Sequence, residues 1–353
     1  MFPNKRVQGM VGKRVHVEMK GERNVLEGVL TSVDDYLNLH LSGANEVENG
    51  ERKRLLGSVV VRGNNVVLIN PLKGLIDLFF CGGVTESNMN TVADMQKEVV
   101  AYKIYLAETS GGLYIRDEML PEAIKAVEAT SKPLVVHCED QGIIERRKEE
   151  LKIRGKEWRG QQVEIHSELR PEEAELSAVE KVVATVSLSN KINIAHVSVY
   201  ATLGIIRQHK KVHCEVTPHH LFFSKTDVLA KKAFLKTNPP LRTEENRLRL
   251  LGAFKEGEID FLVTDHAPHT KEEKARDILE APAGVPNLDT YGNFVSWLIV
   301  CCDVHPKLIS RVCSYNPATF LGLNDRVRIE VGKRANLTIL DLKKRVNISS
   351  EHL

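Results

Sequence analysis

The sequence lacks several features that would assign it to a specialised class of protein. Its formal net charge is only +2 over 353 residues, so binding of nucleic acid would have to depend on a local site and not on a global basic field. The six cysteines include no Cys-x-x-Cys spacing and follow no secretory signal, which predicts reduced thiols in a cytosol. No apolar run approaches the roughly 18 residues that span a bilayer, and we expect a cytoplasmic protein with no membrane partner.

The composition is that of an ordinary globular protein. With 42% hydrophobic and 27% charged residues, the chain can bury a sizeable core, and its length fits a small domain followed by a larger one. The pattern of the sequence changes near residue 72. We predict one domain over residues 1–72, a second over residues 73–341, and a short C-terminal segment over residues 342–353.

Short alternating strands are predicted in the first seventy residues. The stretches "KRVHVEMKG" and "VLEGVLTSVDDYLNLHL" alternate apolar and polar residues around glycines, and "LLGSVVVRGNNVVLINP" adds two further β-rich halves. Five short strands in about sixty residues are typical of a small closed barrel.

This segment resembles an Sm-like (LSm) protein. "VGKRVHVEMKGERNVLEGVLTSVDDYLNLHL" is similar to the first Sm motif, and "LGSVVVRGNNVVLI" is similar to the second. The resemblance implies a homo-oligomeric Sm ring, joined through exposed edge strands, that binds U-rich single-stranded RNA. It also implies that Tyr36 stacks on a base, that Asn38 bonds to the edge of the base, and that Arg62 and Asn64 complete the pocket. The alternative is that the two asparagines are turn residues and that Tyr36 only packs.

Beyond residue 73, β-rich runs alternate with helical stretches, which is typical of a parallel α/β fold. Strands are predicted at residues 76–81, 101–106, 134–138, 192–196, 212–215 and 261–264. In a (β/α) barrel, chemistry is assembled where the strands end. One polar residue at a strand end has an ordinary structural explanation, but five in successive strands indicate a site. The five are Lys103, His137, His196, Glu215 and Asp265.

Two histidines, a lysine and an aspartate suit a zinc site only if the lysine is carboxylated, because an ammonium group has no lone pair to donate.

The second domain resembles dihydroorotase, of the cyclic amidohydrolase superfamily. The matching stretches, in family order, include "AYKIYLAETSGGL", "PLVVHCED", "HSELRPEEAE", "INIAHVS", "VHCEVTPHHLFF", "KTNPPLR", "VTDHAPHT", "APAGVPNLDT" and "NPATFLGL". The resemblance implies a TIM-type (β/α)₈ barrel of the metal-dependent hydrolase class. It implies one or two Zn²⁺ ions held by carboxylated Lys103, His137, His196 and Asp265.

The same resemblance assigns the reaction. Asp265 would take a proton from the attacking water and pass it to the departing amide nitrogen, in the interconversion of N-carbamoyl-aspartate and dihydroorotate during pyrimidine biosynthesis. His269 and Asn238 would contact the substrate, the loop from Ala281 to Gly284 would line the pocket, and His219 and His220 would support the site. Aspartate transcarbamoylase is a partner of some family members. Hydantoinase and allantoinase share the fold and ligands, but "ETSGGL" and "TNPPLR" favour dihydroorotase.

Two parts of the family pattern are absent. The family's first strand ends in His-x-His followed by a substrate-binding arginine, whereas here "FFCGGVTESN" fits the third strand, so we expect an incomplete barrel without its first two strands. The C-terminal segment resembles only the start of a small β-sandwich. We therefore expect an impaired or inactive hydrolase. The alternatives are an Sm-like RNA-binding ring protein with a catalytically dead hydrolase domain, and a junction near residues 72–74 that is not biological.

Overall fold

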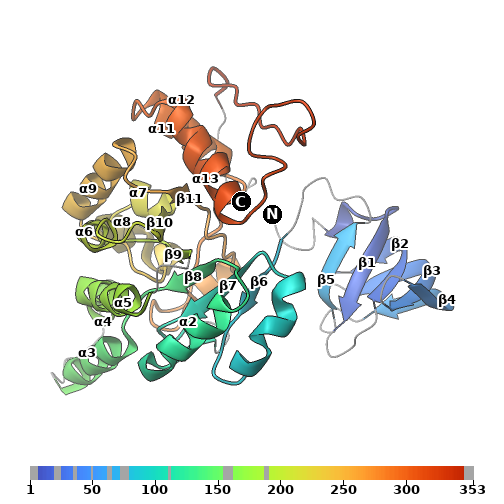
Figure 1. Cartoon of the computed structure of the whole chain (residues 1–353), viewed down its shortest axis with the longest axis horizontal. Helices are drawn as coiled ribbons and strands as arrows, with labels where there is room; N and C mark the ends of the chain where they lie inside the picture. Colours follow the sequence, from blue (N-terminus) through green and yellow to red (C-terminus); the bar gives the residue numbers. More distant parts are fainter. Residues whose placement is uncertain are drawn as a thin grey trace. The chain divides into compact units, whose positions relative to one another are not determined.

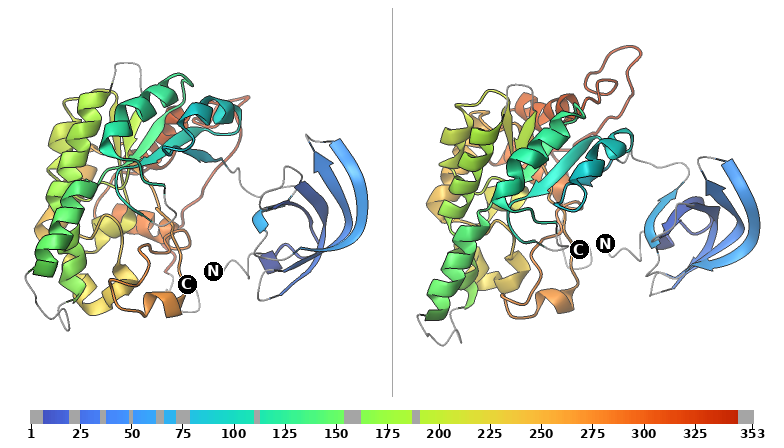
Figure 2. Two further views of the ribbon diagram at one scale, coloured as in Figure 1. Left: turned by 90° about the horizontal axis from the view of Figure 1, so that it is seen from below. Right: turned by 60° about the horizontal axis from the view of Figure 1, so that its bottom comes forward.

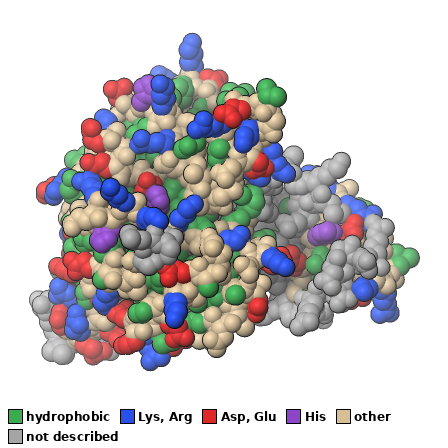
Figure 3. All heavy atoms as spheres, in the orientation of Figure 1, with side chains coloured by type: hydrophobic (Ala, Val, Ile, Leu, Met, Phe, Trp, Pro, Cys, Tyr) green, Lys and Arg blue, Asp and Glu red, His purple; other side chains and the backbone are tan. Residues whose placement is uncertain are grey.

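The computed structural model describes residues 7–19, 25–34, 38–48, 51–61, 66–71, 79–109, 113–153, 162–186 and 191–345. The chain divides into two compact units, an N-terminal unit that ends at Leu78 and an α/β unit over Phe79–Val346. Of the described helices, none is long and apolar enough to cross a membrane. Figure 3 shows charged side chains of both signs interspersed on the visible face, in keeping with the small net charge.

Five antiparallel strands form the N-terminal unit, as the sequence predicts (Figure 1). They are β1 (Arg14–Met19), β2 (Val25–Val33), β3 (Leu39–Glu48), β4 (Glu51–Val61) and β5 (Val66–Pro71), in the sheet order β4-β3-β2-β1-β5. Alternate side chains such as Val15, Val17 and Leu26 are buried in a core that also contains Leu30 and Leu41. Period-two burial of this kind is what the alternating sequence requires.

A glycine in β2 allows this sheet to curve. A Cβ atom at Gly28 would lie 3.2 Å from the Cα of Ala44 and 3.2 Å from the Cβ of Leu41 on β3. The register between β2 and β3 also shifts at this point. The strands therefore bend around a small core (Figure 2), and β4 and β5 form the edges of the sheet within the described residues.

Six parallel strands form the sheet of the α/β unit. They are β6 (Cys81–Gly83), β7 (Ala101–Tyr105), β8 (Leu134–His137), β9 (Ile192–Ile194), β10 (Val212–Val216) and β11 (Phe261–Leu262). Their order in the sheet is the order in the chain, β11-β10-β9-β8-β7-β6, and every pair is parallel. Sequential parallel strands are the arrangement of a (β/α) barrel. Within the described residues the sheet is an arc whose edges are β6 and β11.

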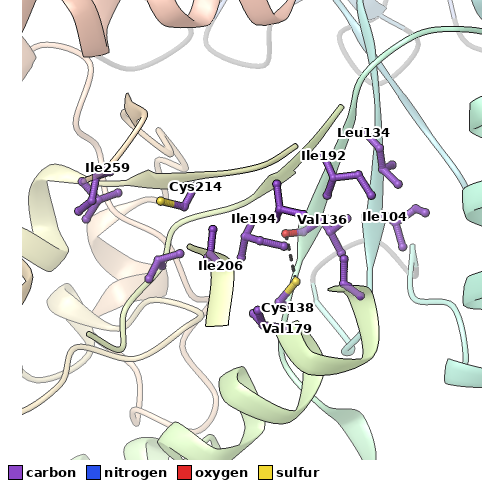
Figure 4. Close-up of a cluster of buried hydrophobic side chains, with 14 of the residues drawn as sticks. Ile104, Leu134, Val136, Cys138, Val179, Ile192, Ile194, Ile206, Cys214 and Ile259 are labelled. Atoms are coloured by element: carbon purple, nitrogen blue, oxygen red, sulfur yellow. Dashed lines mark hydrogen bonds between the residues drawn. The ribbon is translucent and has the colours of Figure 1, made fainter. Parts of the chain in front are cut away.

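Helices connect these strands and cover the sheet (Figure 1). Figure 4 shows side chains of neighbouring strands, among them Val136 and Ile194, in one apolar cluster with Val179 of α5. This cluster buries one face of the sheet. The helical elements are η2 (Met89–Lys97), η3 (Asp117–Met119), α2 (Leu120–Glu128), α3 (Gln141–Ile153), α4 (Gln162–Leu169), α5 (Glu172–Thr185), α6 (Thr202–Ile206), α7 (Pro218–Phe222), α8 (Lys225–Lys231), η4 (Lys232–Leu235), α9 (Glu244–Lys255), α10 (Lys271–Lys274), α11 (Tyr291–Val300), α12 (Pro306–Ser310), the π-helix η5 (Arg311–Tyr315) and α13 (Asn316–Phe320).

One of the six strand predictions is displaced. The strand expected at residues 76–81 begins at Cys81, where the prediction ends, and residues 76–78 lie outside the described residues. Phe79 and Phe80 precede the strand and are exposed. The strand begins at Cys81 because its partner in the parallel register is Ala101, the first residue of β7. The other five strands are confirmed, although β7, β8, β9 and β11 end earlier than expected and β10 ends later.

The segment after α13 contains no described strand, although its sequence resembles the start of a β-sandwich. Ile329 and Ile339 are 88% and 94% exposed, because no strand pairs with this part of the chain within the described residues. Residues 326–340 form one wall of a cavity of about 730 Å³ whose other wall is α11 and α12.

Two neighbouring glycines in β6 provide a matched test of packing in the arc. A Cβ atom at Gly82 would lie 3.0 Å from the buried ring of Tyr102, whereas one at Gly83 would lie 3.6 Å from Leu113. The ring cannot move easily, because the Tyr102 hydroxyl donates to Val92 O at 2.6 Å. We expect Gly82→Ala to lower the free energy of unfolding of the α/β unit by about 1–3 kcal/mol through overpacking.

Gly83→Ala is the control, because it changes the same strand without the close contact. Chemical denaturation of both variants measures the difference. Equal stability of the two variants would contradict the packing described here.

Candidate functional site

The strand order places the predicted polar residues at one edge of the parallel sheet. Lys103 lies in β7 opposite Val135 of β8, and His137 is the last residue of β8. His196 follows β9 in a turn and Asp265 follows β11, with φ values of 39° and 43°. These left-handed conformations are uncommon for residues other than glycine and are found disproportionately at functional sites.

His137 and His196 are in direct contact. The His137 Nδ1 lies 3.0 Å from the His196 Nε2, and the two side chains are almost completely buried. Burial lowers the pKa of both imidazoles, and Lys103 adds to the effect through its charge. Both rings are therefore neutral at pH 7, which is the state in which imidazole binds a metal.

A buried carboxylate fixes the orientation of His137. Glu139 Oε2 lies 2.8 Å from His137 Nε2, and Arg170 forms an ion pair with the same oxygen. Although burial opposes ionisation, Arg170 and His137 lower the pKa of Glu139 to about 2. An ionised carboxylate only accepts, so Nε2 of His137 donates and its Nδ1 presents a lone pair towards His196.

The pair fits one metal ion. Two nitrogen ligands at about 2.0–2.1 Å from a tetrahedral Zn²⁺ stand about 3.3–3.4 Å apart, close to the separation of His137 Nδ1 and His196 Nε2. A carboxylate behind a histidine ligand, as Glu139 stands behind His137, is also typical of metal sites. No cluster of three or more His, Cys, Asp or Glu side chains suited to a metal occurs among the described residues. Among the described residues, two of the predicted metal ligands, His137 and His196, are therefore in direct contact.

Lys103 acts through its charge on the histidine pair and on Asp265. Burial raises the pKa of the Asp265 carboxyl, and the charge of Lys103 opposes this effect. Burial likewise raises the pKa of Glu215, against the charge of Lys103. Glu215 accepts hydrogen bonds from Asn193 Nδ2 and from the His196 backbone N–H. A carboxyl with a raised pKa beside neutral imidazoles is suited to proton transfer.

The loop that carries Asn238 is held by two buried histidines. His166 Nε2 lies 2.9 Å from Thr237 O, and His220 Nε2 lies 3.2 Å from Pro239 O. Burial lowers the pKa of both imidazoles to about 3, so both remain neutral. Within the described residues, the inaccessible Asn238 Oδ1 has no hydrogen-bond partner. Such an acceptor is available to a donor on a ligand.

The loop that carries Ala281 and Gly284 packs on the segment that follows Asp265. His269 Nε2 lies 3.1 Å from Ala283 O. Gly284 has a φ of 136°, and a Cβ atom there would lie 2.6 Å from Ala267 O, so only glycine fits. The structure therefore gathers Ala281, Gly284 and His269 in one loop cluster next to Asp265.

Asn287 connects this cluster to His219. Its Nδ2 donates to Thr264 O at 2.7 Å and lies 2.8 Å from His219 Nδ1. His219 thus supports the strand end that carries Asp265. Asn287, Glu139 and Arg170 were not predicted as site residues, although all three lie inside the quoted stretches "APAGVPNLDT", "HCED" and "ELRPEE". The neighbours of each residue lie in the same stretch, so the sequence does not distinguish it from them.

The predicted RNA-binding residues are mostly outside the described residues. This applies to Tyr36, Arg62 and Asn64. The fourth, Asn38, donates from its backbone N–H and its side-chain Nδ2 to Asp34, at 2.8 Å and 2.7 Å. These bonds tie Asn38 to the residue that follows β2, so Asn38 has a structural role whether or not it contacts RNA.

Two family models match the sequence. The model described as LSM domain matches residues 5–71, and the model described as Amidohydrolase family matches residues 110–352. A dihydroorotase from Methanosarcina acetivorans is 33% identical over 76% of this chain and 59% of its own length. A dihydroorotase from Staphylococcus epidermidis is 32% identical over 72% of this chain and 60% of its own length. The chain therefore spans about three fifths of the length of these relatives.

Solved structures of hydantoinases have a similar fold. An L-hydantoinase (dihydropyrimidinase) from Arthrobacter aurescens superposes with a TM-score of 0.66 at 24% identity, over 72% of this chain and 58% of that one. A D-hydantoinase from Thermus sp. superposes with a TM-score of 0.64 at 19% identity, over 71% and 57% of the two chains. At these identities the likeness concerns the fold.

Glu139 offers a test of the histidine pair as a metal site. Glu139→Gln keeps the size of the side chain but removes the charge that holds His137 Nε2–H, so we expect zinc affinity to fall by about 10- to 100-fold. Competition with a chromophoric chelator measures this affinity.

The matched control is Glu149→Gln, at an exposed glutamate on α3. Its zinc affinity should equal that of the unmodified chain. An equal loss in both variants would contradict the role of Glu139.

Proposed function

Because this chain belongs to the amidohydrolase family and carries an LSM domain before the amidohydrolase part, as both sequence resemblances predict, we propose that its α/β unit is a weak dihydroorotase. The substrates would be dihydroorotate and N-carbamoyl-aspartate, which the unit interconverts. The observation that carries this proposal is the pair of neutral histidines, held by Glu139, at the edge of the strand arc next to Asp265.

Different residues would bind the metal and transfer the proton. His137 Nδ1 and His196 Nε2 would hold Zn²⁺, with Lys103 as a third ligand once it is carboxylated. Bound zinc polarises a carbonyl and acidifies water. Asp265, whose pKa is raised, accepts a proton from the attacking water and returns it to the amide nitrogen that leaves. Asn238 Oδ1, a buried acceptor without a hydrogen-bond partner among the described residues, would receive a ring N–H.

Two features support low activity. None of the 13 histidines forms a His-x-His pair, so the second half of a two-metal cluster has no ligands of that kind in this sequence. The described sheet is an arc of six strands, where a closed barrel has eight. Loss of a direct ligand costs more than the roughly 10- to 100-fold typical of residues that only orient the ligands.

Zinc content and turnover test this proposal together. We expect the purified full chain to bind at most one zinc ion with His137 and His196, and to hydrolyse dihydroorotate at least about 100-fold more slowly than the M. acetivorans enzyme assayed beside it. Asp265→Asn should abolish the residual rate, whereas Asp289→Asn, at an exposed position, should leave the rate and the zinc content unchanged. Two zinc ions per chain with turnover within tenfold of the reference would disprove the impairment.

We further propose that the LSM domain binds U-rich single-stranded RNA as a ring of identical chains. The five-stranded antiparallel sheet with edge strands β4 and β5 supports this, because edge strands can pair between neighbouring chains. In the sequence, Tyr36 stands between β2 and β3, and Arg62 directly follows β4.

Fluorescence anisotropy with oligo-uridine and oligo-cytidine tests the RNA proposal. Tyr36→Ala and Arg62→Ala should each weaken oligo-uridine binding by about tenfold, since stacking on one base is worth about 1–3 kcal/mol. Arg54→Ala removes an exposed charge from β4 and is the control. Equal affinity for both oligonucleotides, unchanged in the variants, would rule this function out.

A further inference from the structure

Two lysines of the α/β unit are buried without a carboxylate partner. Lys236 follows η4 and is 8% exposed, and Lys274 ends α10 and is 5% exposed. Lysine is rarely this buried unless it is paired with an acid. Among the described residues, no carboxylate lies within ion-pair distance of either ammonium group. Their position therefore requires another explanation.

Both ammonium groups bind the backbone of one loop. Lys236 Nζ donates to Ala281 O at 2.6 Å and to Leu279 O at 3.3 Å. Lys274 Nζ donates to Gly284 O at 2.8 Å and to Pro282 O at 3.0 Å. Both lysines thus act on the loop from Leu279 to Gly284, which contains the predicted substrate-binding residues Ala281 and Gly284.

The two lysines are also joined to each other. Lys274 Nζ donates to Lys236 O at 3.2 Å, and Gly284 N–H donates to the same carbonyl at 2.9 Å. Lys236 immediately precedes Thr237 and Asn238. The lysines therefore connect the loop that carries Asn238 with the loop that carries Ala281 and Gly284, so a shift in one loop would be transmitted to the other.

The neighbouring carbonyls of the loop are engaged as well. Ala283 O is paired with His269 Nε2 at 3.1 Å, and Val285 O accepts from Ala267 N–H at 3.1 Å. The carbonyl groups of the loop thus accept hydrogen bonds from protein donors, and two of these donors are charged ammonium groups. Burial lowers the pKa of both lysines to about 8, so both are largely charged at pH 7. Of the surrounding charges, Arg170 and Asp277 act on Lys236, and Lys236 acts on Lys274.

We propose that Lys236 and Lys274 are positioning residues that hold the Leu279–Gly284 loop and make the site select a cyclic amide that carries a carboxylate over a neutral one. The proposal rests on the proposed function of the same site. Its physical basis is that two ammonium charges with no carboxylate within ion-pair distance make the electrostatic potential around this loop more positive, which favours an anion. The sequence has no His-x-His pair and therefore no arginine after one, and these lysines carry positive charge beside the loop that contains Ala281 and Gly284.

The first experiment compares two ligands that differ in one carboxylate. Binding of dihydroorotate and of neutral dihydrouracil to the full chain is measured by calorimetry at pH 7. The unmodified chain should prefer dihydroorotate, and Lys236→Met and Lys274→Met should each reduce this preference, the ratio of the two affinities, by about tenfold. Lys271→Met is the control, because it removes an exposed charge from the same helix as Lys274. A preference that is unchanged in both buried variants would overturn the proposal.

The second experiment examines the loop without a ligand. Lys274 Nζ is surrounded by three carbonyl oxygens, those of Lys236, Pro282 and Gly284, as a monovalent cation is in a carbonyl cage. In Lys274→Ala, amide hydrogen exchange at residues 279–285 should become at least about tenfold faster and should be restored by ammonium chloride, but not by tetramethylammonium chloride of equal ionic strength. Exchange equal to that of the unmodified chain would show that Lys274 does not hold the loop.

The two experiments distinguish a failure of this inference from a failure of the proposed function. If the unmodified chain binds neither ligand, the proposed function fails and the selectivity fails with it. Slow exchange in the unmodified chain and rescue by ammonium would still establish the positioning role. If both ligands bind equally well in every variant, the site recognises the ring and the lysines do not determine selectivity.

Discussion

The candidate site depends on the parallel register of β7, β8 and β9. Ile104 pairs with Val136, and Val136 pairs with Ile194, so the ends of these strands coincide at one edge of the sheet. His137 and His196 are 59 residues apart in the chain and meet only because of this register. A slip of one residue would turn every side chain of a strand to the other face and separate the two rings. Figure 4 shows the apolar packing that fixes the register, in which the Cys138 thiol donates a hydrogen bond to Val136 O.

The ionisation of each group in the site depends on its burial and on the charged side chains next to it. His137 and Glu139 are both buried, yet the imidazole is neutral and the carboxyl is ionised, because Arg170 reaches the carboxylate from α4's C-terminal end. Removing the charge from water is costly unless a partner compensates it. Glu139 thereby fixes the tautomer of His137 before any ligand binds, so this imidazole needs little reorganisation.

Much of this arrangement could be predicted from the sequence, and the reasons are local. Alternating and continuous apolar runs locate the strands, and polar residues at their ends locate the histidine pair and Asp265. The first strand of the arc was expected to include Phe79 and Phe80 because they are apolar, whereas the described strand is Cys81–Gly83, where glycine admits the Tyr102 ring. Lys236 and Lys274 could not be found, because a lysine in a sequence is expected at the surface. Their partners are backbone carbonyls, which leave no trace in the identity of the residues that carry them.

The lysine contacts have a consequence for how the loop responds to its surroundings. A free cation in a carbonyl cage has a dissociation constant, so its occupancy varies with the salt content of the solution. The ammonium group of Lys274 is covalently attached and its effective concentration at the cage is constant. The shape of the loop is therefore independent of which ions are present outside. Only a change to the amine itself would weaken these contacts, and loss of its proton is such a change because burial lowers its pKa to about 8.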